Sequence, residues 1–234
     1  MNQSVNHQRK PESGQTYFGD TGVNAYTRNA HKGILILWEK KFVNSILSTA
    51  EPSQAVRVLD MGTGPGWIPV RLAQQRPAWE ITGLDFSKRM LDQARNLAEK
   101  KNVNVNWVEA DVLNTGLPPE HFDLVISHFS LHELPEIPHV LKEVSRLLKP
   151  DGRFIAHDLA RPPAHRIPVM CVINWLLSFS MEFTRQYADS LRASYTMDEM
   201  AQFLASSPLQ GRVQSIHGGS QFRIEAVKKD KTNL

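Results

Sequence analysis

A glycine-rich segment follows a short apolar run at residues 55–59. The segment contains an acidic residue and then three glycines at alternate positions, namely Asp60, Gly62, Gly64 and Gly66. The apolar run is typical of a buried strand in a parallel sheet, and the residues after the glycines predict a helix. Glycines at a strand-to-helix turn allow positive φ angles and a close approach of a ligand. Because open α/β sheets bind ligands at the carboxyl ends of their strands, we expect a binding site at this turn.

The spacing of the glycines argues against a dinucleotide as the ligand. A dinucleotide-binding turn has the pattern Gly-x-Gly-x-x-Gly, in which the third glycine lets the helix pack closely on the strand. In this chain Trp67 occupies that third position, Gly66 comes one residue early, and Asp60 is not part of the pattern. Three glycines alone could also serve only to form a tight turn, so the other motifs have to decide.

Acidic residues end two further apolar segments. Asp85 ends the expected strand at residues 80–85, and Asp111 follows the expected strand at 105–109. A carboxylate at the end of the second strand can accept hydrogen bonds from both ribose hydroxyls of a nucleoside. The positions of Asp60 and Asp85 therefore indicate a nucleoside-type ligand at one edge of the sheet.

Five motifs in register over residues 55–158 resemble one enzyme family. The pattern D-x-G-x-G-x-G at residues 60–66 resembles motif I of the class I S-adenosylmethionine-dependent methyltransferases. Residues 122–128 (FDLVISH) resemble the fourth-strand motif of that family, and residues 147–155 (LLKPDGRFI) resemble its L-K-P-G-G turn. The chain is most similar to the small-molecule enzymes of the family, including the quinone-biosynthesis type.

This resemblance implies S-adenosylmethionine as the methyl donor and assigns roles to single residues. In the family, the aspartate matched by Asp111 meets the adenine amino group, and the residue matched by Val112 contacts the ring. The resemblance implies a cofactor site made of Tyr26, Asp60, Gly62, Thr63, Gly64, Asp85, Phe86, Met90, Asp111, Val112, Ser127 and His128.

The alternation of expected strands and helices predicts the fold class. It implies a parallel sheet with helices on both faces. In the resembled fold, residues 210–216 and 221–227 form strands six and seven, and strand seven is antiparallel. We therefore expect an α/β, Rossmann-like, seven-stranded, mostly parallel sheet. The expected organisation is a polar N-terminal tail and lid helices at 1–50 and a methyltransferase domain at 51–234, with a helical insertion at about 162–195.

The segment at residues 167–183 is strongly apolar but is interrupted by polar residues such as Asn174 and Glu182. It lacks the run of about 20 apolar residues that a membrane span needs. We expect a cap helix over the acceptor site, with Trp175 and Phe179 lining it. A dimer contact and a membrane-surface helix remain alternatives. The aromatic residues in the lid segments, which could pack or stack on the acceptor, are Tyr17, Phe18, Tyr26, Tyr187 and Tyr195.

Methyl transfer needs a general base only if the acceptor is protonated at neutral pH. The candidates near strand ends are His128, His132, Glu133, His157 and Asp158. We take His128 and His132 as the candidate catalytic residues. His132 could instead be positional and pack beneath the methionine part of the cofactor, and His128 could simply bond to the backbone. Nothing in the spacing of the histidines demands a metal ion, so no metal site is expected.

Composition limits the other partners. The net charge is +3 with scattered Lys and Arg, so no basic stripe for nucleic acid is visible. Cys171 is the only cysteine, and the polar N-terminus has no signal-peptide pattern, which favours a cytoplasmic protein. We expect a small-molecule acceptor, no stable membrane insertion, and a homodimer as an option. The alternatives are a methyltransferase that acts on protein or RNA with a partner, and a non-catalytic S-adenosylmethionine-binding protein.

Overall fold

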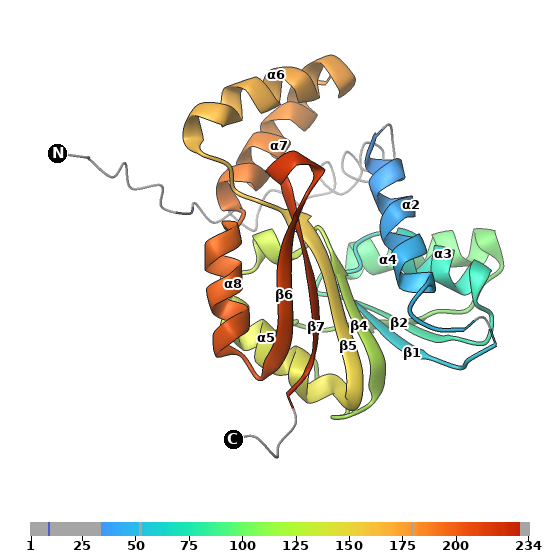
Figure 1. Cartoon of the computed structure of the whole chain (residues 1–234). Helices are drawn as coiled ribbons and strands as arrows, with labels where there is room; N and C mark the ends of the chain where they lie inside the picture. The colour runs from blue at the N-terminus through green and yellow to red at the C-terminus, as the bar shows by residue number, and fades with distance from the viewer. Residues whose placement is uncertain (1–8, 10–33, 52, 179, 230–234) are drawn as a thin grey trace.

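The computed structural model describes residue 9 and residues 34–51, 53–178 and 180–229. Seven strands form one sheet in the order β3-β2-β1-β4-β5-β7-β6 (Figure 1). The strands are β1 (Arg57–Met61), β2 (Glu80–Asp85), β3 (Asn106–Glu109), β4 (Phe122–His128), β5 (Leu148–Leu159), β6 (Leu209–Ile216) and β7 (Gln221–Lys228). Strands β1 to β5 pair in parallel, and β7 pairs antiparallel with both β5 and β6. The predicted fold class is confirmed, including the antiparallel seventh strand.

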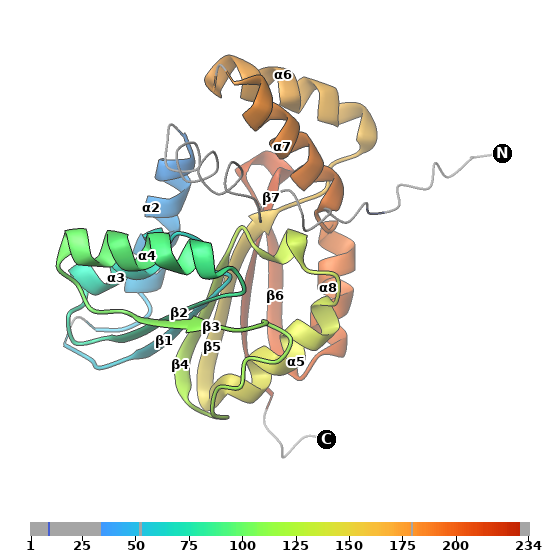
Figure 2. The ribbon, with the colours of Figure 1, turned by 180° about the vertical axis from the view of Figure 1, so that it is seen from behind.

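Helices cover both faces of the sheet, as the two opposite views show (Figures 1 and 2). The helices are α2 (Ile34–Leu47), α3 (Trp67–Gln75), α4 (Lys88–Lys101), α5 (Ile137–Leu147), α6 (Ile167–Ser178), α7 (Met181–Ala193) and α8 (Met197–Ser206). Short 3-10 turns are η1 (Leu131–Glu133), η2 (Ala164–Arg166) and η3 (His217–Gly219).

The two hydrophobic cores follow from the two-residue period of a strand, which sends successive side chains to opposite faces. On β1, Val58 packs with α2 and α3, whereas its neighbour Leu59 packs with α5 and α8. On β5, Ile155 joins the first core, and Phe154 and Ala156 join the second. Both faces are therefore apolar, as expected for central strands of a sheet covered on both sides.

Local sequence signals set several element boundaries. Ser87 caps α4 by accepting a hydrogen bond from the Met90 amide at 3.4 Å. Thr196 and Glu199 form a capping box at the start of α8. Strand β5 begins at Leu148, which pairs with Phe122 before an irregularity in the β4–β5 register.

The apolar segment after β5 folds as two helices rather than one. Ser180 caps α7 by accepting a hydrogen bond from the Phe183 amide at 3.2 Å, so the chain turns between α6 and α7. Ile167 on α6 packs with Leu159 and Leu191 in a small third core. Among the described residues, no helix combines the length and the apolar character needed to cross a bilayer.

Candidate active site

The glycine turn closes over the end of β2. The backbone amides of Gly62 and Thr63 both donate to the Leu84 carbonyl oxygen at 2.9 Å. β1 lies between β2 and β4 in the sheet, so their carboxyl ends meet beside this turn. The predicted binding edge is thus formed by residues that are far apart in the sequence.

Each glycine of the turn has a positive φ, but their surroundings differ. A Cβ atom on Gly62 (φ 72°) would lie 2.6 Å from Ser130, and one on Gly66 (φ 80°) would lie 2.7 Å from both Ala94 and the Trp107 ring. A Cβ on Gly64 (φ 52°) would meet no atom within 4 Å. Gly62 and Gly66 are therefore required by packing, whereas Gly64 faces the space that a ligand could enter.

Asp85 holds this turn with both carboxylate oxygens. Its Oδ2 accepts a hydrogen bond from the Gly64 amide at 2.7 Å, and its Oδ1 accepts one from the Ser87 amide at 2.8 Å. A carboxylate oxygen has two lone pairs, so each oxygen can still accept a hydrogen bond from a ligand hydroxyl. Burial raises the pKa of Asp85 above its usual range, and the two backbone hydrogen bonds oppose that rise.

A second carboxyl group lies beneath the turn. Asp60 is 2% exposed and accepts a hydrogen bond from the Thr63 hydroxyl at 2.7 Å. Burial, and to a lesser extent the charge of Asp85, raises the pKa of Asp60 to about 7, against the hydrogen bond from Thr63. A cationic group bound at this edge would favour the ionised form of both carboxyls.

The end of β3 completes the edge on the far side of β2. The Ala110 amide donates to the Asp85 carbonyl oxygen at 3.2 Å, which brings the following residues beside the end of β2. Asp111 is exposed, and its Oδ1 accepts a hydrogen bond from the Leu113 amide at 2.9 Å. Val112 is buried in the adjoining core. An exposed acid beside a buried aliphatic side chain provides one polar and one apolar contact for a ligand.

The remaining predicted cofactor residues are placed as follows. Met90 is buried on α4, and Phe86 is 65% exposed just after β2. The Ser127 hydroxyl lies 2.7 Å from that of Ser130, which donates to the Met61 carbonyl oxygen at 3.1 Å and so ties the end of β4 to the end of β1. The predicted residues Tyr17, Phe18 and Tyr26 lie outside the described residues.

His128 ends β4 and differs from the neighbouring polar residues. Its ring nitrogen Nε2 is buried and has no hydrogen-bond partner among the residues described. Burial, with a further contribution from the charge of His157, lowers the pKa of His128 well below 6.5. The ring is therefore neutral at pH 7. Its unpaired buried nitrogen can accept a hydrogen bond from a bound molecule, or donate one to it, according to the tautomer.

His132 has a different environment from His128. It is buried on η1, and its Nδ1 lies 2.6 Å from Oδ1 of Asp158, which is fully buried. The backbone amide of His132 donates to the other oxygen of Asp158 at 3.2 Å. Double attachment to one carboxylate fixes η1 against β5. This geometry favours a positional role for His132 over the catalytic one.

Arg9, near the start of the chain, binds the backbone around η1 and the end of α7. Its guanidinium donates to the carbonyl oxygens of His132, Leu134 and Ala193 at 2.6–3.0 Å and lies over the Tyr195 ring. The sequence analysis did not identify Arg9, because no sequence pattern reveals a guanidinium site formed by three carbonyl oxygens and an aromatic ring.

Aromatic rings surround His128, and most of them were not anticipated from the sequence. Phe42 of α2 lies 4.7 Å from the His128 ring, Phe129 lies 4.4 Å from it, and His157 lies 5.2 Å from it, as centroid distances. Nε2 of His157 lies 2.6 Å from the side-chain oxygen of Gln221. Burial lowers the pKa of His157 to about 4, so its ring is also neutral at pH 7. Gln221 begins β7, the antiparallel strand that pairs with β5 and so lies beside His157. This position is the sequence signal that could have predicted the cluster.

An open groove of about 940 Å³ lies elsewhere, at the amino ends of β2 and β3. Its lining includes Glu80, Asn104, Asn106 and His121, and none of the predicted site residues contributes to it. Parallel sheets bind ligands at the carboxyl ends of their strands, so we place the active site at the glycine turn and not at this groove.

Comparisons with known proteins agree with this geometry. Residues 58–152 match the family described as a methyltransferase domain. Solved structures share the fold over most of the chain. A methyltransferase from Aquifex aeolicus superposes with a TM-score of 0.66 at 18% identity, and the match covers 91% of this chain and 100% of that protein. The plantazolicin methyltransferase in complex with S-adenosylhomocysteine superposes with a TM-score of 0.72 at 17% identity, and the match covers 92% of this chain and 93% of that protein.

The match to a methyltransferase domain is limited to residues 58–152, which run from β1 past β4 and include the glycine turn. A demethylmenaquinone methyltransferase of Thermus thermophilus is 32% identical over 131 residues, which is 56% of this chain and 58% of the relative. A 2-phytyl-1,4-naphthoquinone methyltransferase of Synechococcus elongatus is 33% identical over 135 residues, 56% and 55% of the two chains. The matched region thus spans little more than half of these relatives. The family resemblance predicted from the sequence is confirmed.

Proposed function

We infer that this protein is an S-adenosylmethionine-dependent methyltransferase that acts on a small, apolar acceptor of quinone type. The observation that carries the inference is the pairing of Asp85 with the glycine turn. Asp85 can still accept two hydroxyl groups while it holds Gly64, whose outer side is open to a ligand. That arrangement suits a nucleoside whose ribose sits against the turn.

The acceptor class is supported by two observations. Within the matched regions, about a third of the residues are identical to those of the quinone methyltransferases named above. Around His128, the buried rings of Phe42 and His157 and the half-buried ring of Phe129 form an aromatic, uncharged environment, which is compatible with a planar acceptor.

The residues of the chain have distinct tasks in this reaction. When bound, S-adenosylmethionine supplies a methyl group that its sulfonium centre already activates. The chain contributes binding and orientation through Asp85 and Asp60, and proximity is worth several kcal/mol in such transfers. Nε2 of His128, neutral and unpaired, can take the proton of an acceptor hydroxyl.

Replacing His128 with asparagine is expected to lower the methyl-transfer rate by about 100-fold or more, because a positioned base contributes about that factor. The assay combines trideuteromethyl-labelled S-adenosylmethionine with a reduced 1,4-naphthoquinone, and mass spectrometry detects the labelled product. Affinity for S-adenosylhomocysteine should stay unchanged. The exposed His139→Asn variant, on α5, is the matched control and should keep full activity.

Three outcomes of that assay would count against the inference. If the native protein transfers no label to any quinol, the acceptor class is wrong. If His128→Asn retains full activity, the base assignment is wrong. If His128→Asn instead loses affinity for S-adenosylhomocysteine, His128 belongs to the cofactor site and not to the acceptor site.

Cofactor binding is expected to release protons near neutral pH. The pKa of Asp60 is about 7, so much of this carboxyl is protonated at pH 6.5, and the cationic cofactor would favour its ionised form. Calorimetry of S-adenosylmethionine binding at pH 6.5, in two buffers of different ionisation enthalpy, should detect up to about three-quarters of a proton released. The release should disappear at pH 8.5 and in Asp60→Asn.

The same pKa has a consequence for the stability of the free protein. The pKa of Asp60 is higher in the folded than in the unfolded chain, so the folded state binds more protons between about pH 4 and pH 7. The contribution of Asp60 to the free energy of unfolding therefore falls as the pH rises through this window. Asp60→Asn should remove that part of the pH dependence, and an unchanged profile would contradict the role of this carboxyl.

A further inference from the structure

Large exposed hydrophobic side chains gather on α6 and at the start of α7. Each is between 42% and 61% exposed, and together they are Val169, Val172, Ile173, Trp175, Leu176 and Met181. We call this set the α6 stripe. Contiguous apolar surface of this kind on a folded protein marks an interaction site.

The spacing of the stripe shows that α6 is apolar on two faces. Val169, Val172, Ile173 and Leu176 follow the i, i+3, i+4, i+7 spacing of one helix face. Other residues of α6, including Ile167 and Met170, pack into the third core with Leu159 and Leu191. A helix that is apolar on both faces is normally buried. Within the described part of the chain, nothing covers the outer face of α6.

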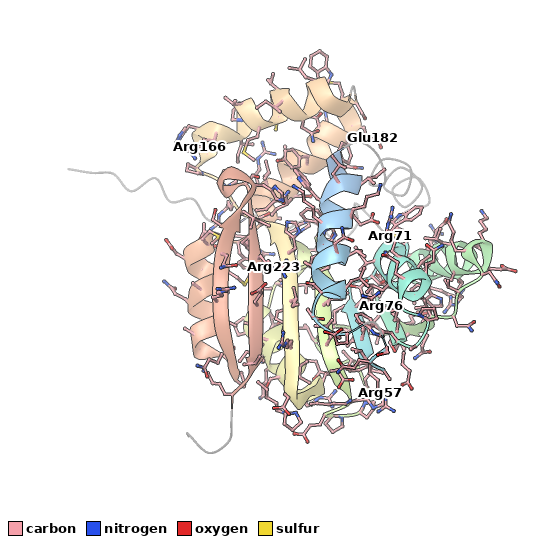
Figure 3. All side chains as sticks on the ribbon, turned by 45° about the vertical axis from the view of Figure 1, so that its right-hand side comes forward. Arg57, Arg71, Arg76, Arg166, Glu182 and Arg223 are labelled. Atoms are coloured by element: carbon pink, nitrogen blue, oxygen red, sulfur yellow. The ribbon has the colours of Figure 1, made fainter. Side chains whose placement is uncertain are left out.

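We propose that the α6 stripe docks on the surface of a lipid bilayer. The sequence has no charged residue from 167 to 181, so the stripe can enter the boundary between head groups and acyl chains without burying a charge. Exposed basic side chains flank it, with Arg166 before α6 and Arg185 on α7. Arg166 and Glu182 lie near opposite ends of α6 (Figure 3). Because Glu182 offsets part of the positive charge, burial of apolar surface supplies most of the binding.

The dimensions of α6 favour a lipid surface over the other occupants. A helix of twelve residues is about 18 Å long, shorter than the ~30 Å hydrocarbon core, so it lies on a bilayer and does not cross it. One such helix face, about 10 Å wide, covers roughly 200 Å², whereas a stable protein interface buries about 800 Å² per partner. The stripe alone is therefore small for a dimer contact.

Docking would place the candidate acceptor site beside the bilayer. The core beneath α6 includes Phe129, the neighbour of His128. The phytyl group named in one relative's substrate is a long hydrocarbon chain that partitions into lipid. This link to the acceptor rests on the proposed function, whereas the lipid contact itself does not.

Sedimentation with vesicles tests the proposal without any turnover. The native protein should bind phosphatidylcholine vesicles and bind somewhat more strongly when phosphatidylglycerol is included. A variant with Val172→Ser, Ile173→Ser and Leu176→Ser should show an apparent partition coefficient lower by about tenfold or more, because interfacial binding scales with buried apolar area. Val227→Ser is the matched control, since Val227 is 41% exposed on β7 and outside the stripe.

Each outcome decides the proposal. Vesicle binding that the triple variant loses and Val227→Ser keeps supports it, provided that both variants bind S-adenosylhomocysteine like the native protein. No vesicle binding, or equal binding by all variants, overturns it. Self-association of the native protein without vesicles, abolished in the triple variant, would assign the stripe to a second copy of the chain. Failure of methyl transfer with intact vesicle binding would contradict only the proposed function.

Discussion

Replacing Asp85 with alanine is expected to weaken binding of S-adenosylhomocysteine by about 30- to 1000-fold, or about 2–4 kcal/mol. The variant would leave two ribose hydroxyls without an acceptor. It would also leave the amides of Gly64 and Ser87 unpaired, since these now donate to Asp85. Isothermal titration calorimetry measures the change in affinity directly.

Two further variants separate loss of ligand contacts from loss of the fold. Asp111→Ala should weaken binding of S-adenosylhomocysteine less than Asp85→Ala does, because it removes only the contact with the adenine amino group. Asp92→Ala removes a half-exposed acid on α4 and should not change the affinity. Thermal unfolding of all three shows whether the fold persists. A fully folded Asp85→Ala protein with unchanged affinity would mean that the ribose lies elsewhere.

Gly66→Ala is expected to lower the free energy of unfolding by about 2–5 kcal/mol. The left-handed conformation at φ 80° costs about 1–2 kcal/mol for a residue with a Cβ, and overpacking costs about 1–3 kcal/mol more. The overpacking arises because the new Cβ would lie 2.7 Å from both Ala94 and the ring of Trp107. Urea denaturation followed by circular dichroism measures the loss.

Gly64→Ala is the matched variant for this prediction. It carries a similar backbone cost, but its Cβ meets no atom within 4 Å. Its stability should therefore fall by only about 1–2 kcal/mol, whereas its affinity for S-adenosylhomocysteine should fall because the methyl group enters the ligand's space. Equal stability losses in the two variants would show that Trp107 and Ala94 do not confine Gly66.

The sequence predicted the parts of this protein that depend on local or periodic signals. The apolar runs that end in an acidic residue placed Asp60 and Asp85 at the ends of two strands. The mostly parallel sheet followed from the alternation of strands and helices, and its antiparallel seventh strand followed from the family resemblance. The alternation and the strand ends depend on residues close together in the chain, where spacing carries physical information.

The parts that the sequence did not predict depend on contacts between distant segments. His132 and Asp158 are 26 positions apart in the chain, and their pairing is set by how η1 returns to β5. Arg9 reaches carbonyl oxygens more than 100 positions away. Periodicity also could not tell which face of the strongly apolar helix α6 is covered. Trp175, expected to line the acceptor site, is therefore found 42% exposed, while Phe179 lies outside the described residues.

Calorimetric comparison of S-adenosylhomocysteine with NAD tests the central claim most directly. We expect micromolar binding of S-adenosylhomocysteine and no detectable binding of NAD, because Trp67 replaces the third dinucleotide glycine and Asp60 precedes the turn. Competition by S-adenosylmethionine should abolish the signal. Tighter binding of NAD than of S-adenosylhomocysteine would contradict the assignment of this edge as a methyl-donor site.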